Sequence, residues 1–367
     1  MTDQITLIHI DVPMTEPFRI SSGQVCSKES ILIRIDRNGF CAFGESSPMT
    51  GSFYSEETPG STWDFLVDRA IPKIIREGRF QPEFAARCAA EDRAERFVWA
   101  GLEGALWDLR VQEQGTSFIE CLDAELSPIP SGLAVGIYSA IEDLLDACSR
   151  HLNSHYARLK IKIEPGWDIE PVRAIRQAFG NIPLMVDANG SYSETDFRIF
   201  EELDDMGLVM IEQPLARDNL KGHVELQARL ATPICLDESI SSTEGAKRAI
   251  ESAACRIINL KIQRLGGLIS TKEIYDLCLE NGVPTWMGTM PELGIGALHA
   301  LYMSLLPNCV YPTDVEASSR WFVEDIIDPP ISVLNGHIEI PPEHRDRPNV
   351  SLRIVDRYAV RAKTLLL

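Results

Sequence analysis

The sequence lacks several features by which common classes of protein are recognised. Its nine cysteines are scattered, and no two have the CxxC spacing of zinc sites and redox motifs. Unclustered cysteines in odd number are typical of reduced thiols, so we expect a cytoplasmic protein. No apolar run approaches the roughly 18 residues of a membrane helix, and the first residues show no basic and apolar leader of a signal peptide.

Positive charge is also scarce. Lys and Arg number 35 against 54 Asp and Glu, which gives a formal net charge of −19. A surface of this sign repels nucleic acid and anionic membranes, so neither is an expected partner. The GxSxG, P-loop and HExxH motifs are missing, which argues against serine hydrolases, P-loop nucleotide-binding proteins and zinc proteases.

The first third of the chain combines strand patterns with helical ones. Residues 5–12 and 30–37 alternate between apolar and polar side chains, and residues 40–46 could pair with the second segment across Asn38-Gly39. From about residue 56 to 114 the apolar period becomes helical. Because 367 residues are long for one core, we expect an α+β capping domain at residues 1–125 beside a larger domain.

From residue 126 to 320, short apolar strands alternate with segments long enough for a helix. Such alternation predicts parallel strands, and its number of units predicts a (β/α)7–8 TIM-type barrel, with eight strands as the leading choice. Residues 321–367 add no such unit, and we expect them to return to the capping domain. The eight predicted strands are residues 132–137, 157–163, 182–188, 207–213, 232–238, 255–262, 283–288 and 308–314.

Five charged residues stand at the ends of successive predicted strands. They are spaced by about 25 residues, the length of one strand–helix unit in this barrel. Since the carboxyl ends of barrel strands gather around one mouth, we expect the five side chains to converge there. In chain order they are Lys162, Asp187, Glu212, Asp237 and Lys261.

The three acidic members of this set predict a metal site. Crowded carboxylates repel one another, and a hard divalent cation removes that repulsion. Carboxylates completed by water and a substrate oxygen suit Mg²⁺, with Mn²⁺ as the other possibility, whereas the lack of His and Cys argues against Zn²⁺. We therefore predict that Asp187, Glu212 and Asp237 are Mg²⁺ ligands.

The lysines predict acid–base chemistry. Lys160 and Lys162 are two residues apart on one strand and therefore share a face. A general base must be partly neutral near pH 7, and a second ammonium disfavours the charged form of Lys162. We predict Lys162 as the base, Lys160 as the group that tunes it, and Lys261 on the opposite side of the ligand. The alternative is that the lysines only neutralise the acids.

Several motifs occur in an order that resembles the enolase superfamily, muconate-lactonizing enzyme subgroup. They are KIK (160–162), DAN (187–189), IEQP (211–214), CLDES (235–239) and NLK (259–261). The stretches LKIKIEPGWDIEPVR, TPICLDESI and KIQRLGG are similar, more narrowly, to the o-succinylbenzoate synthase / N-succinylamino acid racemase family. The resemblance runs over nearly the whole chain, from PFRISSG (17–23) to the last barrel strand.

This resemblance implies Mg²⁺-dependent removal of a proton α to a carboxylate through an enolate intermediate. It implies a small carboxylate substrate and one of two outcomes, or both. One is dehydration to o-succinylbenzoate in menaquinone biosynthesis, and the other is racemisation of an N-succinylamino acid or another N-acylamino acid. We also expect a homo-oligomer.

The resemblance assigns roles to residues as well. The five charged residues match, in order, the family's base, its three metal ligands and the opposing lysine. Arg264 matches an arginine of members that racemise, and Asn189 and Glu238 stand beside metal ligands, where they would support them. Residues 19–27 and 49–57 match loops that cover the barrel mouth.

The chain departs from the family pattern in loops expected to contact the substrate. The loop GTMPELG (288–294) has the unexpected residues Pro291 and Leu293, although Glu292 is retained. The last strand reads TDVEASS (313–319), with Glu316 where a small neutral residue is usual.

An additional carboxylate at this loop would disfavour a succinyl tail and favour a cationic group. Asp314 and Glu316 are similar to the acidic groups that bind an α-amino terminus in dipeptide epimerases, so such an epimerase is an alternative. A muconate-type cycloisomerase of the same fold is another. A non-catalytic binding protein that has kept the barrel is a remote one.

Overall fold

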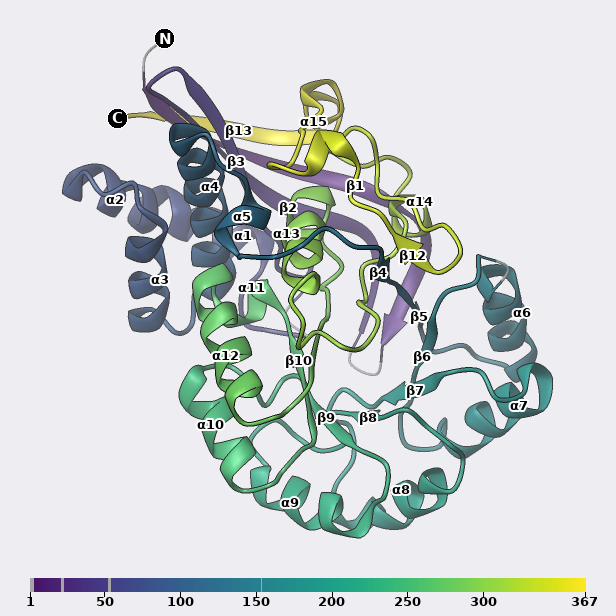
Figure 1. Ribbon diagram of the computed structural model, residues 1–367. Helices are drawn as coiled ribbons and strands as arrows, with labels where there is room; N and C mark the ends of the chain where they lie inside the picture. The colour runs from purple at the N-terminus through teal and green to yellow at the C-terminus, as the bar shows by residue number, and fades with distance from the viewer. Residues whose placement is uncertain (1–2, 21–22, 52–53, 153) are drawn as a thin grey trace.

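The computed structural model describes residues 3–20, 23–51, 54–152 and 154–367. It contains a four-stranded antiparallel sheet and a curled seven-stranded parallel sheet, and Figure 1 shows the second sheet inside an arc of helices. This confirms the predicted class, an α/β barrel with an N-terminal α+β unit. Residues 21–22 and 52–53, which belong to the two loops expected over the barrel mouth, lie outside the described residues.

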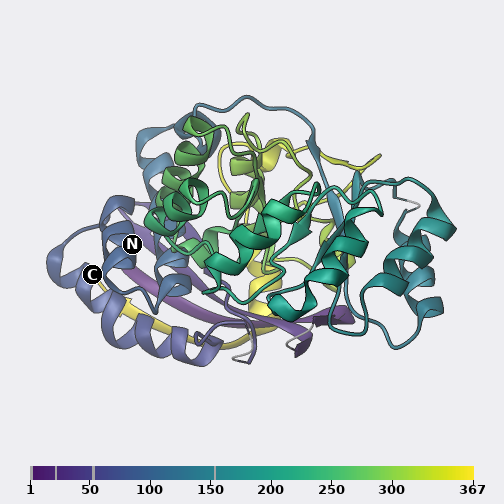
Figure 2. The same cartoon turned by 90° about the horizontal axis from the view of Figure 1, so that it is seen from below.

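The antiparallel sheet begins with the three strands that the alternating pattern predicted. They are β1 (Gln4–Ile20), β2 (Gly23–Arg37) and β3 (Phe40–Ser46). Asn38 and Gly39 connect β2 to β3 with φ values of 53° and 83°, the left-handed region that a two-residue hairpin turn requires. The fourth strand, β13 (Ala359–Leu366), comes from the end of the chain and pairs antiparallel with β1, as Figure 2 shows.

Helices cover one face of this sheet. Their contact with β3 is unusually close, because a Cβ atom on Gly44 would lie 2.1 Å from the carbonyl oxygen of Gly101 in α4. A Cβ atom on Gly101 would likewise lie 2.1 Å from Oγ of Ser46. The helical elements are α1 (Pro59–Phe65), a π-helical turn (Leu66–Ala70), α2 (Ile71–Glu77), α3 (Pro82–Glu91), α4 (Arg96–Gln114) and α5 (Phe118–Cys121).

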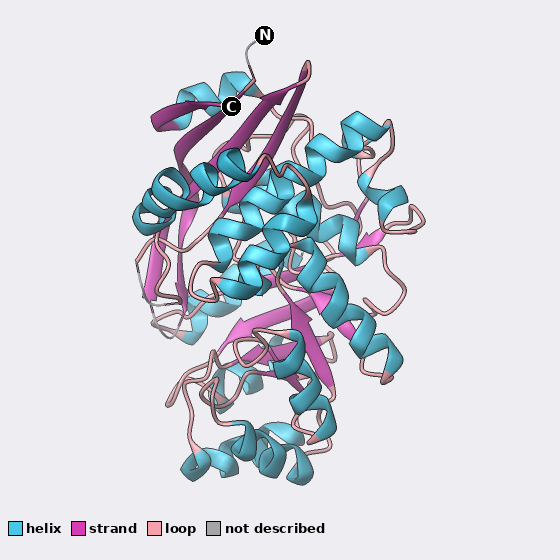
Figure 3. Ribbon diagram, turned by 90° about the vertical axis from the view of Figure 1, so that its left-hand side faces the viewer, coloured by secondary structure: helices cyan, strands magenta, loops and turns pink. Residues whose placement is uncertain are grey.

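The parallel sheet has the strand order of the chain, from β5 to β11. Its strands are enclosed by helices (Figure 3). Its bounds are β5 (Gly132–Val135), β6 (Arg158–Lys162), β7 (Leu184–Asp187), β8 (Ile211–Glu212), β9 (Ile234–Leu236), β10 (Ile257–Leu260) and β11 (Thr285–Met287). The helices are α6 (Ile141–Leu152), α7 (Ile169–Phe179), a 3-10 turn (Glu194–Asp196), α8 (Phe197–Asp204), α9 (Leu220–Arg229), α10 (Thr243–Glu251), α11 (Ile262–Leu265), α12 (Leu268–Glu280) and α13 (Gly294–Ser304).

The eighth predicted strand is not a regular strand. Residues 308–314 make single parallel bridges on both sides, from Cys309 to Thr285 of β11 and from Thr313 to Ser131 beside β5. Pro312 has no N–H group and so cannot donate to a continuous ladder. The segment nevertheless occupies the eighth position and closes the ring between β11 and β5.

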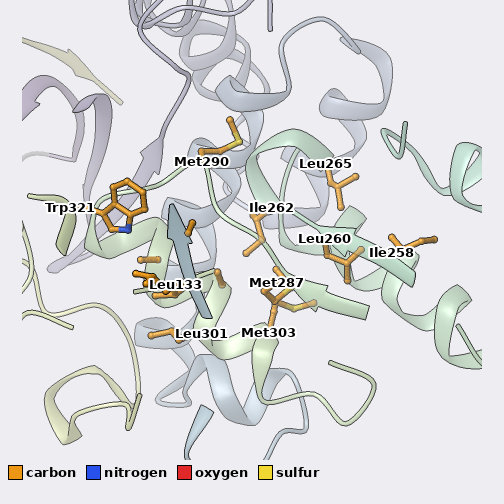
Figure 4. Packing of buried hydrophobic residues seen from close by; sticks show 14 of the residues in the cluster. Leu133, Ile258, Leu260, Ile262, Leu265, Met287, Met290, Leu301, Met303 and Trp321 are labelled. Atoms are coloured by element: carbon orange, nitrogen blue, oxygen red, sulfur yellow. The ribbon is translucent and has the colours of Figure 1, made fainter. Parts of the chain in front are cut away.

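Apolar side chains fill the space inside and around the barrel. Leu133, Leu260 and Met287 from three strands belong to one buried cluster with Leu301 and Met303 of α13 (Figure 4). This packing fixes the strands whose carboxyl ends carry the charged residues.

The last segment of the chain crosses back over the molecule. It contains α14 (Ser318–Trp321), β12 (His337–Ile338), a 3-10 turn (Pro342–His344) and α15 (Leu352–Tyr358) before β13. The strand β12 pairs with β4 (Ile129–Pro130). None of the helices in the described ranges is long and apolar enough to cross a membrane.

The close contact of α4 with β3 predicts a strong effect of one methyl group. Gly44→Ala should lower the free energy of unfolding by about 1–3 kcal/mol, because the added Cβ meets backbone that cannot yield without moving the helix. Chemical denaturation monitored by circular dichroism measures the change. The matched control is Gly60→Ala in α1, whose Cβ would approach only Oγ1 of Thr58, at 3.9 Å. Equal stabilities of the two variants would contradict the prediction.

Candidate active site

Five charged side chains stand at the carboxyl ends of neighbouring barrel strands. Lys162, Asp187 and Glu212 are the last residues of β6, β7 and β8, while Asp237 and Lys261 directly follow β9 and β10. Lys162 is the register partner of Asp187, and Asp187 is that of Glu212. Parallel pairing therefore brings the side chains to one mouth of the barrel.

The two outer lysines enter this mouth from opposite sides. The strands β6 and β10 are four positions apart, in a ring whose eighth position is the segment 308–314. Lys162 and Lys261 line the same cavity of about 50 Å³, together with Lys160, Asn189 and Asp314. An amine on each flank of one small cavity is the arrangement that proton transfer to two faces of a ligand requires.

Each lysine of the mouth is paired with acid. Lys162 Nζ lies 2.5 Å from Asp187 Oδ2, and Lys261 Nζ lies 2.8 Å from Asp237 Oδ2. Lys160 Nζ lies 3.1 Å from Glu212 Oε2 and 3.4 Å from Asp187 Oδ2. Because these groups are buried, removal of one partner leaves an uncompensated charge in a poorly solvated site.

Lys160 is held as a charged group. Burial works against its charge, but Asp314, Glu212 and Asp187 together raise its pKa above the ordinary value. Asp314 in turn binds Arg158, and both cations lie over the ring of Trp286, at 4.6 Å for Arg158 and 5.1 Å for Lys160. A fixed ammonium thus stands in the same cavity as Lys162, although its tuning of Lys162 stays a prediction.

The carboxylates face the lysines rather than one another. In the described parts of the chain, no three His, Cys, Asp or Glu side chains are arranged to hold a metal ion. Even so, the mouth contains acceptor oxygens without hydrogen-bond partners, namely Asn189 Oδ1, Glu238 Oε2 and Asn259 Oδ1. Unsatisfied buried acceptors are costly, and a hard cation with its water shell would satisfy them. These oxygens stand beside the predicted ligands Asp187, Asp237 and Glu212, and their chemistry suits Mg²⁺.

The carboxylates at this mouth differ in the direction of their pKa shifts. Burial, followed by the charge of Asp187, raises the pKa of both Glu212 and Glu238. Burial acts in the same direction on Asp187, but Lys162 and Lys160 overcome it and lower the pKa of Asp187. Further positive charge at the mouth would stabilise the ionised form of all three carboxylates.

Two other predicted residues support the acids. Asn189 donates from its backbone N to Asp187 Oδ1 at 3.0 Å and from Nδ2 to Glu238 Oε1 at 3.0 Å. Arg264 donates to Asp237 and also to the carbonyl oxygens of Ile240 and Asn259, at 2.9 and 2.7 Å. Arg264 therefore orients Asp237, and it is not among the residues that line the 50 Å³ cavity.

Glu292 and Glu316, from the loops expected to contact the substrate, bind groups of the protein. Glu316 Oε1 accepts from the backbone N of Ala134 at 2.8 Å, and Oε2 lies 3.6 Å from Arg320 Nε. Burial raises the pKa of Glu316 to about 8, against the effect of Arg320. Glu292 accepts from Met290 N at 2.9 Å, and burial raises its pKa to about 7. Both line a cavity of about 10 Å³ that shares Pro291, Asp314 and Trp321 with the lysine cavity.

The two unexpected residues of the loop 288–294 have different positions. Pro291 lines the 50 Å³ cavity. Leu293 is fully buried and donates its backbone N to Glu45 Oε1 at 2.9 Å, so it joins the loop to β3.

Sequence reasoning missed three residues of the site. Asn259 donates to Glu212 Oε1 at 2.6 Å, and Arg158 binds Asp314. Each stands two residues before a lysine of the site, so the two-residue period of a strand was a usable signal. Tyr54, whose ring lies 5.3 Å from Lys261 Nζ, belongs to the loop 49–57 that the resemblance placed over the barrel mouth, but its individual contact with Lys261 was not predicted.

The lysine cavity is small because large side chains fill the mouth. Phe18, Met49 and Trp321 line it. A larger cavity of about 360 Å³ lies among α4, α5 and α12, lined by Trp107, Phe118 and other residues. We assign the site to the smaller cavity, because that is where convergent buried charges meet.

Comparisons with known proteins agree with this geometry. A model of the enolase C-terminal domain-like family matches residues 143–344. The o-succinylbenzoate synthase of Geobacillus kaustophilus is 40% identical over 362 residues, which cover 98% of this chain and 96% of that protein. The N-succinylamino acid racemase of an Amycolatopsis species is 36% identical over 338 residues, which cover 92% of each protein.

A solved structure has the same architecture. It is a member of the enolase superfamily from Listeria innocua, with a TM-score of 0.93 and 31% identity, and the match covers 100% of this chain and 99% of that one. The chain therefore belongs to the enolase superfamily, in the family that includes o-succinylbenzoate synthases and N-succinylamino acid racemases.

Proposed function

We propose that the protein removes the proton α to the carboxylate of a small substrate, as an o-succinylbenzoate synthase, an N-succinylamino acid racemase, or both. The observation that carries the proposal is the placement of Lys162 and Lys261 on opposite strands beside one cavity. The names of the related enzymes support both reactions.

Lys162 is the proposed base. Its Nζ accepts the α-proton when the substrate carbon lies in the cavity, which the fixed ammonium of Lys160 also lines. Enzymes of this superfamily typically depend on Mg²⁺. Asp187, Glu212 and Asp237 would hold Mg²⁺, and the bound ion would supply positive charge that stabilises the developing negative charge on the substrate carboxylate.

Lys261 decides between the two outcomes in this scheme. In racemisation its ammonium returns a proton to the face opposite Lys162. In dehydration the hydroxyl leaves as water with the proton that Lys162 removed, and Lys261 remains a cation beside the intermediate. Arg264 and Asp237 hold this side of the site in place, and Asp237 keeps Lys261 Nζ at 2.8 Å.

The geometry weakens the dipeptide epimerase alternative. That alternative rested on free carboxylates of Asp314 and Glu316 for a cationic group. Asp314 is paired with Arg158 and Lys160. Glu316 Oε1 accepts from Ala134 N, whereas its Oε2 makes no hydrogen bond and lies 3.6 Å from Arg320 Nε, so the case is stronger for Asp314 than for Glu316.

Loss of the base should stop exchange at the α-carbon. Wild-type protein with Mg²⁺ and N-succinyl amino acids in D₂O should incorporate deuterium, and Lys162→Ala should lower the rate by about 10²–10⁴-fold for the enantiomer whose proton faces Lys162. Lys261→Ala should retain that exchange and lose racemisation. Proton NMR measures both rates, and parental exchange by Lys162→Ala would refute the assignment.

Metal removal should abolish the same exchange. Chelation with EDTA should stop deuterium incorporation, and added Mg²⁺ should restore it, because the substrate enolate then regains its counter-charge. Calorimetry should detect Mg²⁺ binding to the wild type and to Glu316→Gln, but weakly or not at all to Glu212→Gln. Full exchange in EDTA, or equal Mg²⁺ affinity in the two glutamine variants, would contradict the metal assignment.

A further inference from the structure

A positively charged cleft lies between the N-terminal part of the chain and the barrel. It has a volume of about 440 Å³. One wall consists of residues 54–57, before α1, and of residues around the start of α4. The other wall consists of residues that follow the barrel strands β8, β9 and β10. We call it the arginine cleft, after the arginines that line it, which are Arg93, Arg96, Arg217, Arg248 and Arg264.

The charge of this cleft is opposite in sign to that of the whole chain. The protein has a formal net charge of −19, yet five arginines line the cleft with only three glutamates. Of these glutamates, Glu57 accepts from Phe97 N at the start of α4, and burial raises its pKa to about 8, so it is mostly neutral near pH 7. Glu238 accepts from Asn189, and Glu56 is exposed to solvent. The cleft therefore carries an excess of positive charge.

Most of these arginines have no counter-ion within the protein. Among the residues that the structure describes, the side chains of Arg93, Arg217 and Arg248 take part in no ion pair and no hydrogen bond. Arg96 donates to the backbone oxygens of Arg93 and Arg264, at 3.1 and 3.5 Å. Burial, and then the charges of Arg264 and Arg93, lower the pKa of Arg96. Arg96 thus stands in a positive field that no neighbouring carboxylate cancels.

The uncompensated arginines belong to both walls. Arg93 and Arg96 come from the N-terminal wall, whereas Arg217 and Arg248 come from the barrel wall. Ser242, which caps α10, also lines the barrel wall, and the N-terminus of this helix adds the positive end of its dipole. Like charges on two walls repel each other. An anion between the walls would be attracted to both and would hold them together.

We propose that the arginine cleft binds the phosphoryl group of a small molecule and that this anion ties residues 54–57 to the barrel. A phosphoryl group carries about 1.5–2 negative charges near pH 7 and three acceptor oxygens, so guanidinium groups from two walls can bind it at once. A carboxylate offers only one planar edge to such a fork. The volume of the cleft leaves room for an organic body beside the phosphoryl group.

The proposed anion site is separate from the lysine cavity, and the inference does not depend on the reaction at the lysines. The two sites are related through the loop that contains Tyr54. This residue lines both cavities, and its ring lies 5.3 Å from Lys261 Nζ. A bound anion that restrains residues 54–57 would therefore restrain the side chain beside Lys261, without any passage between the cavities.

Removal of two cleft arginines tests the site by calorimetry, with inorganic phosphate and glycerol 3-phosphate as probes. At least one probe should bind the wild type at a single saturable site, and Arg217→Gln/Arg248→Gln should weaken that binding at least tenfold. The control is Arg198→Gln/Arg353→Gln, which removes the same charge from exposed positions of α8 and α15 and should change the affinity less than twofold.

The two probes also distinguish the source of the phosphoryl group. Tighter binding of glycerol 3-phosphate supports an organic phosphate as the ligand, and equal affinities support free phosphate. Binding of neither probe would overturn the proposal. So would equal weakening in the two variant pairs, or unchanged affinity in the cleft pair, which is the result expected of an anion held at the lysines instead.

Thermal unfolding gives a second test in which the sign of the effect reverses. In buffer without phosphate, Arg217→Gln/Arg248→Gln should melt at a higher temperature than the wild type, because repulsion between the walls is relieved, whereas the control pair should not. Phosphate should then raise the melting temperature of the wild type, at constant ionic strength, but not that of the cleft pair. A cleft pair that melts below the wild type without phosphate, or gains as much from it, contradicts the proposal. Neither test requires turnover, so the cleft can fail while the proposed function stands, and the reverse.

Discussion

The structure depends on the compensation of buried charge at the mouth of the barrel. Parallel strands force their last side chains into one small space, and the chain fills that space with both ammonium groups and carboxylates. Neither kind could be buried there alone, because the loss of solvation would exceed what the fold supplies. The same pairing that stabilises the barrel keeps Lys162 and Lys261 fixed on opposite flanks, so stability and chemistry share one set of contacts.

The N-terminal sheet is part of this arrangement rather than an appendage. Glu45 at the end of β3 accepts from the backbone N of Leu293 and of Gly296, each at 2.9 Å. Gln263 lies two residues beyond Lys261. Its Oε1 accepts a hydrogen bond from Ser47 N at 3.0 Å, and its Nε2 donates to Glu45 O at 2.8 Å. The sheet therefore holds the seventh strand loop and the end of β10 at once. A change in the packing of this sheet would therefore displace residues on the Lys261 side of the cavity.

Much of the fold was predictable because its signals are local. The strands β7 and β8 end in one charged residue, β9 and β10 are directly followed by one, and β6 alternates charged and apolar residues. Their regular spacing follows from one helix per strand. The position of the eighth barrel segment, residues 308–314, was predicted correctly, but its regular strand pairing was not observed, since Pro312 interrupts the hydrogen-bond ladder. Contacts between distant segments had no such signal. Tyr54 reaches Lys261 across the chain, and the partner of Glu316 is a backbone N–H that any residue at position 134 would offer.

The pairing of β13 with β1 has a consequence for biosynthesis. Gln4 lies opposite Leu366, so the edge of β1 that receives β13 stays unpaired until residues 359–366 have left the ribosome. At ordinary elongation rates this delay is on the order of half a minute. An open edge of alternating apolar residues is a template for association with other chains during that time. The nascent protein is thus open to association with other chains along β1 until β13 is available to cover this edge.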